Sequence, residues 1–210
     1  MPQDKFPTLP RGHHRLSRDQ VGAAQRTRLL MAVVEVVAER GYASATVGDV
    51  LGRAHISRQT FYEHFTNKED CFLAAFDQAA ELLIARLEAA LGPASDPVLV
   101  RLDRVFDSYL RGLAATPELA RALLVEVYGA GREAVRRRLA VQERFAVTVA
   151  DAIAAGQRWR GGLDPHFIGR AVIGAVSALV TARIEAGAGA TMPELRAELT
   201  AFVGALLETA

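Results

Sequence analysis

The stretch from Thr46 to Lys68, TVGDVLGRAHISRQTFYEHFTNK, constrains the fold of this chain more than any other segment. Thr46 and Ser57 are good N-cap residues, and apolar residues follow each of them at helical spacing. The segment Ala54-His55-Ile56 interrupts that spacing. The stretch therefore predicts two short helices joined by a tight turn, with a third helix beginning at its end.

The second of these helices divides its residues between a core face and a polar face. Phe61 and Phe65 are four residues apart, so both can anchor the helix to a core. The remaining positions offer a cation, an amide, a hydroxyl, a phenol and an imidazole, from Arg58, Gln59, Thr60, Tyr62 and His64. Such groups suit base edges and phosphates. From these residues alone, an ordinary helical hairpin with a solvated polar face remains the alternative interpretation.

The segment from Ser57 to Glu69 closely resembles the recognition helix and following turn of the TetR family of transcriptional regulators. The resemblance covers residues 26–77, and its most specific part is Thr60-Phe61-Tyr62-x-His64-Phe65 followed by Lys68-Glu69. His55 departs from the family, which usually has Gly at this position of the turn. This position tends toward a left-handed backbone, which His tolerates less well than Gly, so we expect mild strain or a slightly altered turn at His55.

The resemblance implies a DNA-binding surface and a division of the chain. The DNA-binding residues that it implies are Thr46, Ser57, Arg58, Gln59, Thr60, Tyr62, His64 and Lys68. Arg58 is expected to read a base, because Arg pairs well with guanine, and Lys68 is expected to meet a phosphate. The expected divisions are a disordered basic arm over 1–16, a helix-turn-helix domain over 17–66 and a ligand-sensing and dimerisation domain over 67–210.

Composition predicts an all-α protein of about nine helices. Half of the 210 residues are apolar, and strand-favouring runs are scarce. The net charge of +1 conceals a basic N-terminal third and a mildly acidic remainder, which fits one nucleic-acid-facing module. The single Cys71 excludes an internal disulfide. No apolar run approaches the roughly 18 residues of a membrane span, and no signal peptide is evident, so a soluble, cytoplasmic protein is expected.

The middle of the chain is where the resemblance places a ligand cavity, which differs widely between family members. Apolar residues of these helices could line it, and a few polar groups could orient a ligand. The candidate pocket residues are Phe106, Tyr109, Leu110, Leu113, Leu123, Glu126, Val127, Tyr128 and Phe145, with Asp107 and Arg144 as further polar candidates. Each of these residues has plain core or surface packing as its alternative.

The last two expected helices predict a dimer interface. The helix that begins after Asp164 carries no charge between Arg170 and Arg183, and a helix that is apolar all round needs partners on several sides. The family's usual four-helix dimer would meet this need, while a helix buried within one chain is the alternative. The candidate interface residues are Ala171, Gly174, Ala175, Ala178, Leu199, Phe202 and Leu206.

These features together predict a homodimeric transcriptional regulator, in this family most often a repressor. A small-molecule effector would release it from a near-palindromic double-stranded DNA operator. The alternative is a helical small-molecule or lipid-binding protein that has lost DNA binding. An enzyme is not expected, because the His, Cys and carboxylate residues show no metal-ligand spacing, nucleophile motif or phosphate loop. No cofactor, metal or membrane partner is expected either.

Overall fold

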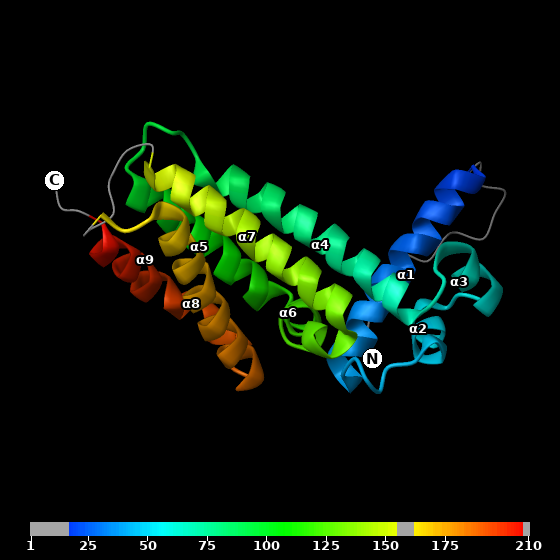
Figure 1. Ribbon diagram of the computed structural model, residues 1–210. Coiled ribbons are helices and arrows are strands. Elements are labelled where there is room, and N and C mark those ends of the chain that lie inside the picture. Colours follow the sequence, from blue (N-terminus) through cyan, green and yellow to red (C-terminus); the bar gives the residue numbers. More distant parts are fainter. Residues whose placement is uncertain (1–16, 155–161, 208–210) are drawn as a thin grey trace.

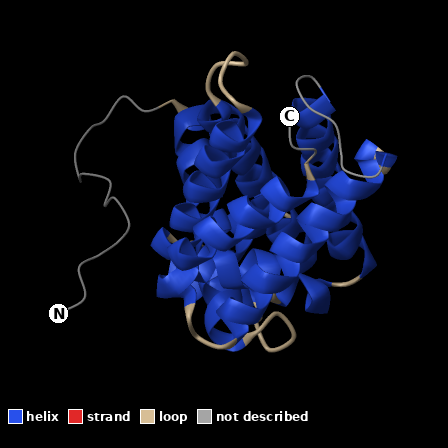
Figure 2. Ribbon diagram, turned by 90° about the vertical axis from the view of Figure 1, so that its left-hand side faces the viewer, coloured by secondary structure: helices blue, strands red, loops and turns tan. Residues whose placement is uncertain are grey.

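The computed structural model describes residues 17–154 and 162–207, and all regular elements within them are helices (Figure 2). The prediction of an all-α fold with about nine helices is therefore confirmed. The first three helices form a head: α1 (Arg18–Arg40), α2 (Val47–Ala54) and α3 (Arg58–His64). The body follows: α4 (Lys68–Leu91), α5 (Val98–Ala115), α6 (Pro117–Leu124), η1 (Glu126–Ala130), α7 (Arg132–Ala154), α8 (Pro165–Glu185), η3 (Gly189–Glu194) and α9 (Leu195–Leu206). The expected basic arm, residues 1–16, lies outside the described residues.

Polar side chains cap the first helix of the head and the first helix of the body. The Ser17 hydroxyl accepts a hydrogen bond from the backbone N–H of Gln20 at 3.2 Å, and the Gln20 side chain accepts one from the N–H of Ser17 at 2.9 Å. Asn67 caps α4 by accepting a hydrogen bond from the N–H of Asp70 at 2.9 Å. These side chains satisfy backbone donors that lack an intrahelical partner, and so they fix where the helices begin.

Farther along the chain, three residues of types that often cap helices make no side-chain cap bond to the helix that follows them. Asp96 binds Arg104 at 2.7 Å instead of capping α5, whose N-cap is Pro97. The Thr116 hydroxyl donates backwards to the carbonyl of Gly112 at 2.9 Å and makes no cap bond to α6. Thr191 lies within η3, so α9 begins later, at Leu195. In each case a competing partner for the side chain overrides the local capping pattern.

Two hydrophobic cores hold the molecule together. The first joins the head to the beginning of α4 and to α6 and η1, with Phe61, Phe72 and Val127 fully buried. Cys71 also lies in this core, as a small buried apolar side chain should. The second core joins α5, α8 and α9 around Leu110, Val172 and Met192. The first core crosses the expected domain boundary at residue 66, so the division into two domains stays a prediction.

The helix α8 packs against α7 (Figure 1), and it also carries exposed apolar side chains, Phe167 and Leu179. Gly169 permits the close approach, because a Cβ at this position would collide with the carbonyl oxygen of Ala146. With 21 residues and a mean hydropathy of 1.6, α8 is long and apolar enough to span a membrane by length and composition alone. The expectation that no such segment exists was therefore too strong. One such helix is weak evidence for a span, since core helices of soluble proteins share these properties.

Candidate nucleic-acid interface and cavity

The short helix α3 is anchored by two phenylalanines and presents its polar residues to solvent. Phe61 and Phe65 are buried in the first core. Arg58 and Gln59 are exposed, and the Tyr62 side chain is 51% exposed with its ring edge against Phe61. The predicted separation of core and polar faces is thus present in the structure. It leaves a cation, an amide and a phenol on one outward surface.

The first turn of α3 is organised by Ser57. Its hydroxyl accepts a hydrogen bond from the backbone N–H of Thr60 at 3.1 Å and lies 3.0 Å from the Thr60 hydroxyl. The Gln59 amide donates to the Glu63 carboxylate at 3.1 Å on the same exposed side. Ser57 therefore acts as the N-cap that its sequence position predicts, and it holds Thr60 in a fixed orientation.

The turn between α2 and α3 contains His55 in the left-handed conformation, with φ 53° and ψ 48°. Among the described residues, His55 is the one non-glycine residue with positive φ. Its backbone N–H donates to the carbonyl of Leu51 and ends α2. The left-handed backbone toward which this position tends is present, and His adopts it at a steric cost that Gly avoids.

Thr46 is committed to capping α2. Its hydroxyl donates to the Asp49 carboxylate at 2.6 Å and accepts from the Asp49 N–H at 3.2 Å. The other carboxylate oxygen of Asp49 pairs with Arg40 at 2.8 Å. The pKa of Asp49 is lowered by the hydrogen bonds that its carboxylate accepts from the Thr46 hydroxyl and the Thr46 backbone N–H, and by the nearby Arg40 charge. The structure thus gives the Thr46 hydroxyl an internal role, and a phosphate contact at this residue stays a prediction.

Lys68 uses its ammonium group inside the head. The Nζ atom donates to the carbonyl oxygens of Tyr42 at 2.6 Å and of Ala45 at 2.8 Å. It also lies 4.1 Å from the centre of the Tyr42 ring. Burial lowers the pKa of Lys68. This geometry differs from the expected role as a free cation for a phosphate, because two of the three N–H donors already bind the loop between α1 and α2.

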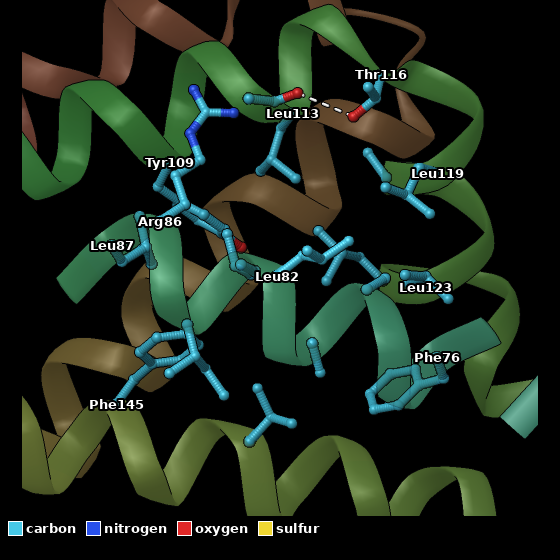
Figure 3. A pocket seen from close by; sticks show the side chains of 18 of the residues that line it. Phe76, Leu82, Arg86, Leu87, Tyr109, Leu113, Thr116, Leu119, Leu123 and Phe145 are labelled. Atoms are coloured by element: carbon cyan, nitrogen blue, oxygen red, sulfur yellow. Dashed lines mark hydrogen bonds between the residues drawn. The ribbon is translucent and has the colours of Figure 1, made fainter. Parts of the chain in front are cut away.

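A cavity of about 750 Å³ lies in the body among side chains from α1, α4, α5, α6, α7 and α8 (Figure 3). Its size is typical of small-molecule sites, and most of its wall is apolar. The structure places five candidate pocket residues on its wall: Phe106, Tyr109, Leu113, Leu123 and Phe145. Burial raises the pKa of the Tyr109 phenol to about 12, and the charge of Arg138 opposes this rise. Arg144 also lines the cavity and pairs with Glu81 at 2.8 Å.

The other candidate pocket residues lie elsewhere. Leu110 and Val127 are fully buried in the two cores, and Tyr128 is exposed. Glu126 accepts hydrogen bonds from the N–H of Tyr42 and from Arg121, so it joins the body to the head. Asp107 pairs with Arg111 and Arg196. The prediction was wrong for these residues for two reasons. The helix α6 ends at Leu124, and the 3-10 helix that follows turns Glu126, Val127 and Tyr128 away from the cavity. Leu110 and Asp107 lie on faces of α5 that do not line the cavity.

Sequence reasoning missed the largest wall of the cavity, which α4 supplies. Phe76, Leu83 and Leu87 belong to it, and their helical spacing is equally typical of plain core packing. Arg138 was also missed, because it stands in the run Arg136-Arg137-Arg138, and such a run is typical of a solvated face. One feature of the sequence could have identified this wall. The apolar pattern of α4 continues along the helix beyond the residues that pack against the head.

The candidate dimer residues fall on two sides of α8 and α9. Ala171, Gly174 and Ala178 are exposed, as is the Phe202 side chain at 42%. Ala175 and Leu206 are half-buried. Leu199 is buried in the second core, so the prediction of Leu199 as an interface residue was wrong. The apolar face of α9 that contains Leu199 packs against other helices of its own chain. Phe202 lies on another face of α9 and points away from the second core.

The described residues contain no group of three or more His, Cys, Asp or Glu side chains arranged to hold a metal ion. Residues 29–75, which hold the helix-turn-helix and its supports, match the family model of bacterial regulatory proteins of the tetR family. This segment of the chain is similar to the tetR family of regulatory proteins. The match covers the anchored α3 and its capped turn, so the family's DNA-binding segment is the part that the sequence comparison identifies.

Similar proteins extend this relationship. The chain is 33% identical over 83 residues to the HTH-type transcriptional activator FasR of Mycolicibacterium smegmatis, and the match covers 40% of this chain and 36% of FasR. The chain spans between 18% and 58% of the length of the curated relatives that it matches.

Solved structures show that the likeness of fold extends through the body. The fatty acid degradation regulator FadR from Bacillus halodurans has a TM-score of 0.77 at 20% identity, covering 85% of this chain and 94% of FadR. FadR from Bacillus subtilis in complex with stearoyl-CoA has a TM-score of 0.73 at 21% identity, covering 84% and 96%. At these identities the likeness concerns the fold alone.

Proposed function

We propose that this protein is a ligand-responsive, sequence-specific DNA-binding transcriptional regulator that acts as a homodimer in the cytoplasm. The observation that carries the proposal is α3, whose Phe61 and Phe65 are buried while Arg58, Gln59 and Tyr62 face solvent. A rigid helix with outward polar groups is what reading of a major groove requires. Two relatives that are similar to the chain in sequence are named an HTH-type transcriptional activator and an HTH-type transcriptional regulator.

In the proposed complex, each head places α3 in a major groove, and the two grooves lie roughly 34–36 Å apart. Arg58 reads a base, because its free guanidinium can bind guanine with two hydrogen bonds. Further contacts with phosphates or base edges keep α3 in register on the DNA, and they come from Ser57, Gln59, Thr60, Tyr62 and His64. Thr46 and Lys68 support the surface from within, through the hydrogen bonds that they make to the head.

The proposed dimer forms through α8 and α9. Phe167, Ala171, Gly174, Ala178 and Leu179 leave an exposed, almost uncharged surface on α8, and Phe202 extends it on α9. A contiguous apolar surface of this kind favours association with a second copy. Two helices from each chain would then form a four-helix interface, which sets the distance between the two heads.

The proposed signal passes along α4. Its first residue, Lys68, binds the head, and its later residues line the cavity. An effector that binds the cavity and moves α4 changes the separation of the heads, so operator affinity falls. We propose release from a near-palindromic operator, hence repression, which is the commonest mode in this family. The complex of the structural neighbour FadR with stearoyl-CoA supports a small-molecule effector.

The test is the selection of bound fragments from a random pool of double-stranded DNA at two salt concentrations. We expect a short near-palindrome whose affinity falls steeply with salt. The variant Arg58→Ala with Tyr62→Ala is the control, and it should enrich no sequence. Weak binding without any enriched sequence, even at low salt, would refute the proposal. The cavity would then favour the second candidate function, a helical small-molecule-binding protein without DNA binding.

A further inference from the structure

Arg138 is the one charged residue that the structure buries among the described residues, with 4% of its surface exposed. It lies on α7, and its side chain lines the cavity. The preceding arginines have acidic partners: Arg136 pairs with Glu133, and Arg137 pairs with Glu133 and Asp77. The ion pairs of the described residues do not include Arg138. A permanent positive charge is therefore buried at the cavity wall, and no carboxylate of residues 17–154 or 162–207 pairs with it.

Within the described part of the chain, the Arg138 guanidinium binds neutral oxygen atoms. Its Nη2 donates to the Ser177 hydroxyl at 2.8 Å, its Nε to the Tyr128 hydroxyl at 3.0 Å, and its Nη1 to the carbonyl of Leu123 at 3.4 Å. These contacts use three of the five N–H donors of the side chain. They also fix its orientation between α6 and α8. The guanidinium thus retains donors and an uncompensated charge at a fixed position.

A small polar cluster surrounds this charge on an otherwise apolar wall. The Gln142 amide donates to the same Ser177 hydroxyl at 2.9 Å, and both residues line the cavity. Tyr109 also lines the cavity, and the Arg138 charge acts on it. Such a group of convergent polar side chains fixes the orientation of a ligand in an apolar site.

The remainder of the cavity is long. Its wall on α4 extends from Ala75 to Leu91, which corresponds to roughly 24 Å at the rise of an α-helix. Phe76, Leu83, Leu87 and Phe145 are among the side chains that face it. A ligand that fills this length against such side chains needs an extended apolar part.

We propose that the effector is an amphiphilic anion, with its acidic group bound by Arg138, Gln142 and Ser177 and its apolar part held along α4. A carboxylate and a phosphate share the required chemistry, because either accepts paired hydrogen bonds from a guanidinium. The bound anion places a negative charge beside the positive guanidinium of Arg138, which pairs with no carboxylate among the described residues. The regulatory consequence rests on the proposed function, whereas the binding itself can be measured without DNA.

The test uses the full chain and three probes that share one alkyl group: dodecanoate, dodecyl phosphate and dodecanol. Isothermal titration should show at least one anion binding about 10- to 100-fold more tightly than dodecanol, the usual effect of a hydrogen bond to a charged group. The comparison of the two anions shows which acidic group the site takes. Equal affinity for dodecanol and both anions, or no binding of any probe, would overturn the proposal.

Arg138→Gln should abolish the preference for the anion, while Arg136→Gln, two residues away on the solvent side, should retain it. If Arg138 only stabilises the fold through α6 and α8, Arg138→Gln will lower stability and leave the preference unchanged, which also overturns the proposal. Should Arg138→Gln not fold, Ser177→Ala serves instead. It should weaken binding of the anion several-fold and leave dodecanol binding unaltered, and an unaltered anion affinity would contradict the site.

The two proposals can fail separately. If the anion binds through Arg138 but does not alter operator binding, the anion site stands and the regulatory role of the ligand fails. If the protein selects an operator but binds no probe, the DNA-binding function stands and the anion site fails. Operator release by dodecanoate or dodecyl phosphate in the wild type, and its loss in Arg138→Gln, would support both.

Discussion

The carboxylate of Glu126 accepts a hydrogen bond from the backbone N–H of Tyr42 at 3.0 Å, although 84 residues separate them in the chain. The backbone carbonyl of the same Tyr42 accepts a hydrogen bond from the Lys68 ammonium at 2.6 Å. One peptide segment at the end of α1 is thus held by η1 on one side and by α4 on the other. This joint connects the body to the head independently of the hydrophobic core.

Replacement of Glu126 tests the strength of this joint. Glu126→Ala should lower the free energy of unfolding by about 1–3 kcal/mol, because the half-buried N–H of Tyr42 and the Arg121 guanidinium both lose an acceptor. Glu126→Gln should cost less, since an amide oxygen can still accept from Tyr42. Urea denaturation provides the measurement. Equal stability of the Ala and Gln variants would show that the hydrogen bond to Tyr42 contributes nothing.

Lys68 and Arg58 should differ in what they support. Lys68→Met should lower stability by roughly 1–3 kcal/mol, because two backbone carbonyls lose a charged donor. Arg58→Met should leave stability unchanged, because Arg58 is exposed, and should cost about 1–3 kcal/mol of discrimination between operator sequences. Thermal unfolding and DNA binding as a function of salt separate the two effects. A stable Lys68→Met variant with a reduced salt slope would instead identify Lys68 as a phosphate contact.

The head could be predicted from sequence because its determinants are local. Ser17, Ser57 and Asn67 cap the helices that follow them, and the left-handed turn at His55 follows from the position of a single residue. The structure of the body was less predictable, because it depends on contacts between residues that are far apart in the sequence. The Thr191 side chain does not cap α9, because Arg183, eight residues earlier, binds the Thr191 side chain and carbonyl in the folded chain.

The cavity shows the same limit. Sequence periodicity cannot separate an apolar residue that faces an empty space from one that faces another side chain, so Leu110 and Leu113 were equivalent candidates until α5 was in place. Arg138 could not be distinguished from Arg136 for the same reason. Only the packing of α7 against α6 and α8 buries the one guanidinium and leaves the other 77% exposed.

Gly169 should be far less replaceable than the other helical glycines. Gly169→Ala should destabilise the protein by about 1–3 kcal/mol, because a Cβ would push the backbone of α8 away from the Ala146 carbonyl of α7. Gly52→Ala, in α2, is the matched control. It meets open space, so it should stabilise by about 0.5–1 kcal/mol through the lower flexibility of alanine. Similar effects of the two substitutions would contradict the close approach of α7 and α8.

Acid should weaken the contact between α5 and α9. Hydrogen bonds from Arg196, and secondarily from Thr200, lower the pKa of Asp103 in the folded protein. The stability that Asp103 contributes is therefore fully present above its unfolded pKa of about 4, and it is lost as the pH falls through the lower folded value. Asp103→Asn should be less stable than wild type at pH 7, and the difference should shrink below pH 4. Urea denaturation across this range measures it, and a difference independent of pH would contradict the role of the charge.

Gly174 lies on the exposed surface of α8, where a Cβ added to the glycine would meet no neighbouring atom within 4 Å. Gly174→Arg should therefore leave the fold of each chain intact and place a charge in the proposed dimer interface. Sedimentation velocity should show conversion from dimer to monomer, and operator affinity should fall because the two half-sites are no longer bound by linked heads. Gly52→Arg, equally unobstructed but in the head, should remain dimeric. A dimeric Gly174→Arg protein would place the interface elsewhere, and the separation of the heads would then depend on another pair of helices.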